Sequence, residues 1–398
     1  MADGEGRDCA SAGNRWQALT GLVLVHGLAV SACAWVGGPP ELPFEVVDVK
    51  AGERHTCLLT STGGVKCWGN NHDGQLGDGK AEDRSVPVDV VGLSGGVQSL
   101  AAGWRHNCAV TAEGLVRCWG NNHDGQLGDG TKADRRSAQQ VVGLMTRVRA
   151  VTTGERHTCA VTVSGGVRCW GNNHDGELGD GTRTDRVTPV DVVGLTSGVT
   201  AIAAGWRHTC ALTTDGRVKC WGNNHDGQLG DGTTVDRMTP VEVMGLGGGV
   251  KAIAARWRHT CALTAAGGVK CWGGNHHGEL GDETRHDRGT PGDVVGLTSG
   301  VKAVATGWRH VCALMTTGTI KCWGNNHEGQ LGDGTGIDRN KPVDVIGVPS
   351  GVIAIAAGGE HSCAVTQRIV TCWGENEDGQ LGDGTFRSTL ARKEEPGL

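Results

Sequence analysis

Fourteen of the sixteen cysteines recur along the chain as seven pairs at a fixed interval. The first members of successive pairs lie 51 residues apart, and the second member follows ten residues later, or nine in the last pair. Two cysteines that face each other across a hairpin either form a disulfide or pack as small buried thiols. We predict disulfides, with buried thiols as the alternative. The pairs are Cys57–Cys67, Cys108–Cys118, Cys159–Cys169, Cys210–Cys220, Cys261–Cys271, Cys312–Cys322 and Cys363–Cys372.

Tryptophan and arginine occupy two adjacent positions just ahead of each cysteine pair. The position four residues before the first cysteine reads Glu53, Trp104, Glu155, Trp206, Trp257, Trp308 and Gly359 along the chain. The next position reads Arg54, Arg105, Arg156, Arg207, Arg258, Arg309 and Glu360. Arginine stacks favourably on indole rings, and both residue types are enriched where proteins bind one another. We therefore predict the functional surface at Trp104, Trp206, Trp257, Trp308, Arg105, Arg207, Arg258, Arg309, Glu53 and Glu155.

Other chemistry is less well supported by the repeat. Two histidines recur in nearly every copy, but one histidine per copy spreads each set around a ring, so no metal site is predicted. The Asp-rich loops lack the alternating acidic ligands of calcium loops. No nucleophile and base stand apart from the repeat, so we predict neither an enzyme nor a cofactor. The net charge of −6 gives no reason to expect nucleic-acid binding.

The elements that carry these residues are short strands. β-Branched runs are bounded by Gly, Asn and Asp, and a period near 50 residues indicates one supersecondary unit in series. We predict an all-β, seven-bladed propeller with four antiparallel strands per blade over residues 43–398. If the cysteines pair across a hairpin, its three-residue loop ends on glycine in six copies, as a left-handed position favours. We also expect 390–396 to complete the first blade.

Residues 1–42 are predicted to be a leader and linker. Arg15 precedes an apolar run, 18–30, of the length of a signal peptide core. The following Val30-Ser31-Ala32-Cys33 is similar to a bacterial lipoprotein cleavage box, in which the cysteine is lipidated. The alternative is a disordered extension. Export would favour oxidised cysteine pairs, so we predict a secreted or lipid-anchored protein whose only membrane contact is through Cys33.

The repeated pattern Gly-x-x-His, hairpin, Trp-Gly-x-Asn-x-x-Gly-x-Leu-Gly resembles the regulator of chromosome condensation repeat family. This resemblance implies a seven-bladed propeller, and the residues around the cysteines are most similar to those of exported bacterial members. Gly-Trp-Arg-His-Thr at 205–209 is also similar to the plant UV-B photoreceptors of the family. In those members, three consecutive tryptophans absorb the light, and neighbouring arginines hold a homodimer that light dissociates.

The favoured function is a non-catalytic propeller that binds a protein or surface ligand through its Trp- and Arg-rich face. The first alternative is a homodimeric UV-B photoreceptor that uses Trp206, Trp257 and Trp308. The second alternative is guanine-nucleotide exchange on a small GTPase. A third interpretation is that Trp-Arg-His is a structural consensus with no binding role.

Overall fold

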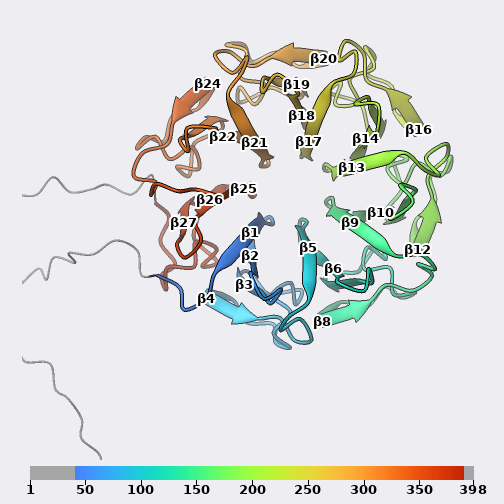
Figure 1. Ribbon diagram of the computed structural model, residues 1–398, viewed down its shortest axis with the longest axis horizontal. Helices are drawn as coiled ribbons and strands as arrows, with labels where there is room; N and C mark the ends of the chain where they lie inside the picture. The colour runs from blue at the N-terminus through green and yellow to red at the C-terminus, as the bar shows by residue number, and fades with distance from the viewer. Residues whose placement is uncertain (1–40, 390–398) are drawn as a thin grey trace, which may run out of the picture. The chain divides into compact units, whose positions relative to one another are not determined.

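The computed structural model describes residues 41–389, and all of them belong to one compact unit. Seven antiparallel sheets are arranged around a central channel, with β1, β5, β9, β13, β17, β21 and β25 innermost (Figure 1). The predicted seven-bladed propeller is confirmed. Within residues 41–389 there is no helix, and so none that could span a membrane.

Each blade runs outward from the channel in chain order, as in β1-β2-β3-β4, and the last blade has three strands within the described residues. The bounds are β1 Val46–Ala51, β2 His55–Thr60, β3 Val65–Gly69, β4 Arg84–Asp89; β5 Val97–Ala102, β6 His106–Thr111, β7 Val116–Gly120, β8 Arg135–Gln140; β9 Val148–Thr153, β10 His157–Thr162, β11 Val167–Gly171, β12 Arg186–Asp191; β13 Val199–Ala204, β14 His208–Thr213, β15 Val218–Gly222, β16 Arg237–Glu242; β17 Val250–Arg256, β18 His259–Thr264, β19 Val269–Gly273, β20 Arg288–Asp293; β21 Val301–Thr306, β22 His310–Met315, β23 Ile320–Gly324, β24 Arg339–Asp344; β25 Ala354–Ala357, β26 His361–Val365, β27 Val370–Gly374.

The cysteine pairs join the second and third strands of every blade. Cys57 lies opposite Cys67 in the β2–β3 ladder, and the other pairs occupy the same register, including Cys363 and Cys372. All seven are disulfides, with Cα atoms 4.1 Å apart. The hairpin loop ends on Gly63, whose φ of 79° is the left-handed conformation expected there. Seven disulfides are typical of a protein that folds in an oxidising, extracytoplasmic environment.

The expected completion of the first blade by the C-terminal segment is wrong. The first blade takes all four strands from its own copy, because 84–89 forms β4 against β3. Thr389 instead bridges Gly374 at the outer edge of the last blade, which is where the first residue of β24 pairs in the blade before it. Residues 390–396 themselves lie outside the described part of the chain.

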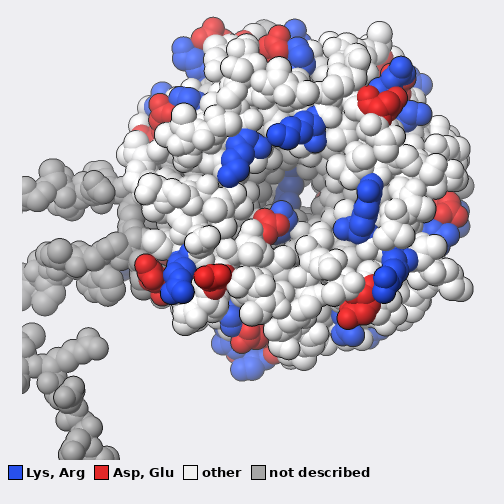
Figure 2. All heavy atoms as spheres, in the orientation of Figure 1, with Lys and Arg blue, Asp and Glu red and all other residues white. Residues whose placement is uncertain are grey.

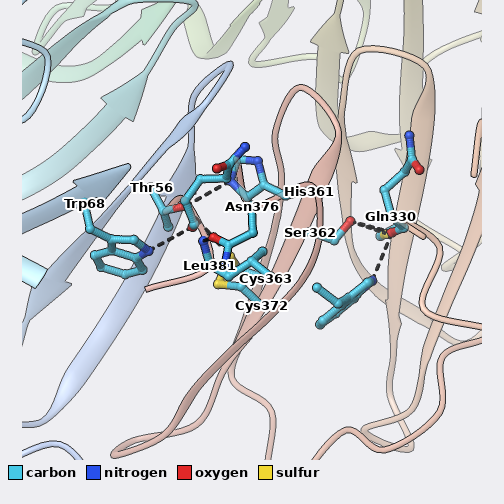
Figure 3. Close-up of a disulfide and its surroundings, with 12 residues drawn as sticks. Thr56, Trp68, Gln330, His361, Ser362, Cys363, Cys372, Asn376 and Leu381 are labelled. Atoms are coloured by element: carbon cyan, nitrogen blue, oxygen red, sulfur yellow. Dashed lines mark hydrogen bonds between the residues drawn. A yellow bond between two sulfur atoms is a disulfide. The ribbon is translucent and has the colours of Figure 1, made fainter. Parts of the chain in front are cut away.

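One buried tryptophan per blade fastens that blade to the one before it. Trp119 is fully buried, and its indole N–H donates to the backbone oxygen of Gln75 in the preceding blade at 3.0 Å. The ring closes with the same contact, because Trp68 donates to the backbone oxygen of Gln380 at 2.9 Å (Figure 3). The equivalent tryptophans are Trp68, Trp119, Trp170, Trp221, Trp272, Trp323 and Trp373.

The histidine that begins each second strand forms another set of contacts between blades. His106 Nε2, for example, lies 2.9 Å from Thr158 Oγ1 of the next blade, and burial lowers the pKa of His106 to about 3. Six of the seven histidines make such a bond. The exception is His259, because the facing residue is Val311. These histidines therefore hold the strand ends of neighbouring blades together, and they are neutral at physiological pH.

Candidate functional site

The predicted surface lies at one end of the channel, where each innermost strand turns into the second strand. The loops between third and fourth strands lie at the same end, because His55 at the start of β2 pairs with Gly69 at the end of β3. We use the term Trp/Arg face for the surface formed by Trp104, Trp206, Trp257, Trp308, Arg105, Arg207, Arg258 and Arg309. In the view of Figure 2, most charged residues at the outer rim lie beside a residue of opposite sign, whereas several Lys and Arg side chains near the channel opening have no acidic neighbour. Lys66 and Asp89 form one of the ion pairs, at 2.6 Å.

Three of the four tryptophans form a continuous stack. The ring centroids of Trp206 and Trp257 lie 4.5 Å apart with 23° between the planes, and those of Trp257 and Trp308 lie 5.3 Å apart. The main chain supports the stack, because the Trp206 amide donates to the Trp257 carbonyl at 2.9 Å. Trp104 is not part of it, since no ring stacking joins Trp104 to the others in the described residues.

Arginines cover the indoles. The Arg207 guanidinium lies 4.6 Å from the centre of the Trp206 ring. The Arg258 guanidinium lies between two rings, 4.7 Å from the centre of Trp206 and 5.6 Å from the centre of Trp257. Trp104 is covered by Arg105 and by Arg156 of the next blade, at 5.0 and 5.3 Å. Arg156 was not among the predicted site residues. Each such contact contributes about 0.5–2 kcal/mol, so the rings and cations hold one another in place.

The same arginines form a belt of ion pairs between neighbouring blades. Arg207 Nη1 lies 3.1 Å from Asp175 of the preceding blade, and the partner carboxylate is 32 positions earlier in sequence. Sequence reasoning considered these loops only as possible calcium loops and missed the role of the aspartates in the site. Within the described residues the pairs are Arg54–Asp378, Arg105–Asp73, Arg156–Asp124, Arg207–Asp175 and Arg258–Asp226. The belt is absent at the next two junctions, where His277 and Glu328 replace the aspartate.

The glutamates among the tryptophans extend this network. Glu53 accepts from Arg105 Nε at 3.1 Å. Glu155 lies 3.4 Å from Arg156 and 3.9 Å from Arg207, yet burial raises its pKa to about 7. Burial and the neighbouring Glu328 raise the pKa of Glu360. The face is therefore rich in arginine near the stack and acidic across the last blades.

Arg256 closes the channel beneath the tryptophans, a role that sequence reasoning missed. Its position is glycine in the other six copies. The Arg256 guanidinium crosses the channel and donates to the backbone oxygens of Ala102 and Gly103 at 3.0 and 3.4 Å. Burial lowers the pKa of this guanidinium to about 10, so it still carries its charge at neutral pH. The break in the repeat was visible in the sequence, but its target 153 residues away was not.

One position in the loops beneath the face holds a buried amide or carboxyl side chain in every copy. The position is glutamine in five copies, and in four of them the side-chain amide donates to an asparagine of the same loop, as Gln228 does to Asn223 at 2.7 Å. Glu177 and Glu279 occupy it in the other two. Because burial disfavours the charged form, it raises the pKa of Glu177 to about 8 and that of Glu279 to about 7.

Glu177→Gln is expected to stabilise the fold in a pH-dependent way. Between about pH 4.5 and pH 8 the folded protein holds a proton on Glu177 that the unfolded chain releases, so stability falls as pH rises through this window. We expect the variant to gain about 1–2 kcal/mol near pH 8.5 and almost nothing near pH 4.5. Urea unfolding at both pH values measures this. The converse variant, Gln228→Glu, should lose more stability than the wild type as the pH rises through this window. If Glu177→Gln had the same pH dependence of stability as the wild type, the raised pKa of Glu177 would be contradicted.

Comparison with known proteins agrees with this architecture. Residues 132–396 match the RCC1-like domain, and 46–75, 97–126 and 62–110 match regulator of chromosome condensation (RCC1) repeats. The chain is 35% identical to the ultraviolet-B receptor UVR8 of Arabidopsis thaliana over 82% of this chain and 76% of that protein. It is 31% identical to the secretion-regulating guanine nucleotide exchange factor of Bos taurus, over 80% and 75%.

Solved structures show the same fold. Human WBSCR16 superposes with a TM-score of 0.74 at 24% identity, covering 82% of this chain and 88% of that one. The propeller, the repeat motif and the match over most of the chain lead to one conclusion: this chain belongs to the RCC1 repeat family.

Proposed function

We propose that this protein is a non-catalytic propeller that binds a protein partner through its Trp/Arg face. The observation that carries the proposal is the stack of Trp206, Trp257 and Trp308 with arginines over its rings. Stacked indoles and arginines held by ion pairs lose little conformational freedom on binding, and such groups dominate interface energetics. The arginines near the stack suit a partner rich in carboxylate or aromatic groups.

The proposal includes export from the cytoplasm. The seven disulfides support it, because they persist in oxidising compartments. Lipidation of Cys33 is part of the same proposal, but Cys33 and the rest of the leader lie outside the described residues.

UV-B-dependent self-association is a second candidate function. Two observations favour it: the 4.5 Å stacking of Trp206 on Trp257, and the 35% identity to the ultraviolet-B receptor UVR8. Indoles at this separation share their excitation, and the arginine-rich and acidic parts of the face are complementary to a second copy turned by a two-fold axis.

A set of arginine variants tests the partner-binding proposal. In Arg207→Ala/Arg258→Ala/Arg309→Ala, we expect the partner retained by immobilised wild-type protein to bind at least about tenfold more weakly, while circular dichroism shows that the propeller is still folded. Lys66→Ala/Lys270→Ala/Lys321→Ala, on the outer rim, is the matched control. A purified partner that binds both variants and the wild type equally would place the interface elsewhere.

The second candidate is distinguished by light scattering in the dark and under UV-B. A wild-type dimer that becomes monomeric on illumination, and a Trp257→Phe protein that does not respond, would support photoreception. An unchanged mass under UV-B would exclude it and leave the partner-binding proposal to the retention measurement.

A further inference from the structure

His277 is a departure from the repeat on the Trp/Arg face. Its position in the loop between third and fourth strands is acidic in the other six copies. The series reads Asp73, Asp124, Asp175, Asp226, His277, Glu328 and Asp378. Five of these aspartates pair with an arginine of the next blade, as Asp226 pairs with Arg258 at 3.3 Å. At His277 that ion pair is missing, and Arg309 has no ion-pair partner among residues 41–389.

The His277 side chain instead meets two groups of the next blade. His277 Nδ1 lies 3.0 Å from Asp338 Oδ2, and His327 Nε2 lies 3.5 Å from Asp338 Oδ1. The two imidazole rings meet edge to face with centroids 5.9 Å apart. One donor atom from each of the three side chains lies within 4.8 Å of the other two. Two loops, from adjacent blades, thus bring two imidazoles and one carboxylate together.

The carboxylate is held in place independently of the histidines. Asp338 is 8% exposed, and its Oδ1 accepts the backbone N–H of Asn326 at 2.9 Å. The equivalent aspartate two blades earlier, Asp236, has the His225 contact at 3.6 Å but no second imidazole. The pair of histidine and aspartate is therefore part of the repeat, and His277 is the added group.

We propose that His277, His327 and Asp338 bind one divalent ion of the late first-row transition metals, with Zn²⁺ as the representative. Two imidazoles and a carboxylate are a donor set that such ions prefer, and hard Mg²⁺ or Ca²⁺ would require more oxygen ligands. The ion would bind between His277 Nδ1 and Asp338 Oδ2 in place of their direct 3.0 Å contact. Three protein ligands leave a coordination position for water or an exogenous ligand.

The surroundings are compatible with a bound cation. Arg285 lies 3.8 Å from Asp338 Oδ2 but is 53% exposed, so it can turn into solvent. An ion at His277 Nδ1 would break the 3.0 Å contact with Asn325 Nδ2, while Asn325 Oδ1 keeps its hydrogen bond from Gln330 at 2.6 Å. A neighbouring cluster, Asp226, His276 and Asp287, is a weaker candidate, because Asp226 is already committed to Arg258.

His277 also lines a pocket of about 280 Å³ with Trp257, Arg258, Glu279 and Arg309. The proposed ion therefore lies at the edge of the Trp/Arg face. A carboxylate that enters this pocket would contact the Arg309 guanidinium and bind the ion at its open coordination position. The metal proposal stands without the proposed function, because its test measures the ion alone.

The test is calorimetric titration of the full chain, without an affinity tag and freed of metal with a chelator, with Zn²⁺. We expect one equivalent to bind, and Co²⁺ at the same site to give the visible absorption of a low-coordinate centre. His277→Asp restores the residue of five other copies, so it should fold normally, and it should bind Zn²⁺ at least about 100-fold more weakly. Asp338→Asn should show a comparable loss.

His225→Ala is the matched control, because it removes the same type of histidine–aspartate contact in a blade without the extra imidazole. It should bind Zn²⁺ as the wild type does. Equal binding by wild type and His277→Asp, or no stoichiometric binding by the wild type, would overturn the proposal. Loss of binding in His276→Ala but not in His277→Asp would move the ion to the neighbouring cluster and overturn it as well.

Discussion

Replacing Trp272 with alanine is expected to lower the free energy of unfolding by about 3–5 kcal/mol. Trp272 is fully buried between two blades and donates its indole N–H to the backbone oxygen of Gln228 at 3.0 Å. The substitution removes the largest side chain at that junction and leaves the Gln228 oxygen with only the Thr260 hydroxyl. Because each blade packs mainly against its two neighbours around the ring, a gap at one junction weakens closure of the whole propeller.

Chemical denaturation monitored by circular dichroism measures this loss. Trp206→Phe is the control, since Trp206 lies on the Trp/Arg face and its indole nitrogen has no hydrogen-bond partner in the described residues. We expect its effect on unfolding to stay below about 1 kcal/mol. If both variants lost similar stability, the distinction between tryptophans that join blades and tryptophans that face a partner would be wrong.

Reduction of the seven disulfides is expected to lower the melting temperature by at least about 10 °C. Each bridge closes a hairpin of nine or ten residues, such as Cys210 to Cys220. The chain-entropy treatment gives about 2–3 kcal/mol per bridge, as an upper value, because the hairpin is already restrained by its neighbours. Removing one bridge in Cys210→Ala/Cys220→Ala should therefore cost about 1–2 kcal/mol, and removing all seven should cost several times as much.

Calorimetry with and without reductant gives the change in melting temperature, and mass spectrometry after alkylation gives the number of bridges. The paired cysteines should react with the alkylating agent only after reduction under denaturing conditions. Fourteen reactive thiols in the unreduced, unfolded protein would contradict the assignment and remove the main support for export.

Within a blade, the sequence was sufficient to predict which residues of neighbouring strands face each other. The ten-residue spacing from Cys57 to Cys67, together with glycine at the loop position Gly63, predicted the register that the structure has. In the seventh copy, the nine-residue spacing predicted that Cys363 still faces Cys372. Such predictions succeed because the hairpin is local: alternation, loop length and one left-handed glycine determine which residues face each other.

Between blades, the sequence was less informative. The prediction put the Trp/Arg positions on one face of the propeller, but it did not show that Arg207 pairs with Asp175 or that Trp104 stays out of the stack. The role of Arg256 and the cluster at His277 were also missed. Both are departures from the repeat, and comparing all seven copies at every loop position would have revealed them as unusual, though not what they contact.

The sequence by itself therefore determined the family, the number of blades, the strand register and the disulfide pairs, because a repeated local pattern contains that information in every copy. Only the tertiary structure decided how the ring closes, which arginine meets which carboxylate, and that His277 meets Asp338. These contacts join residues of different blades, such as Trp68 and Gln380. Their geometry depends on the angle between neighbouring blades, which results from the packing of all seven cores around the channel.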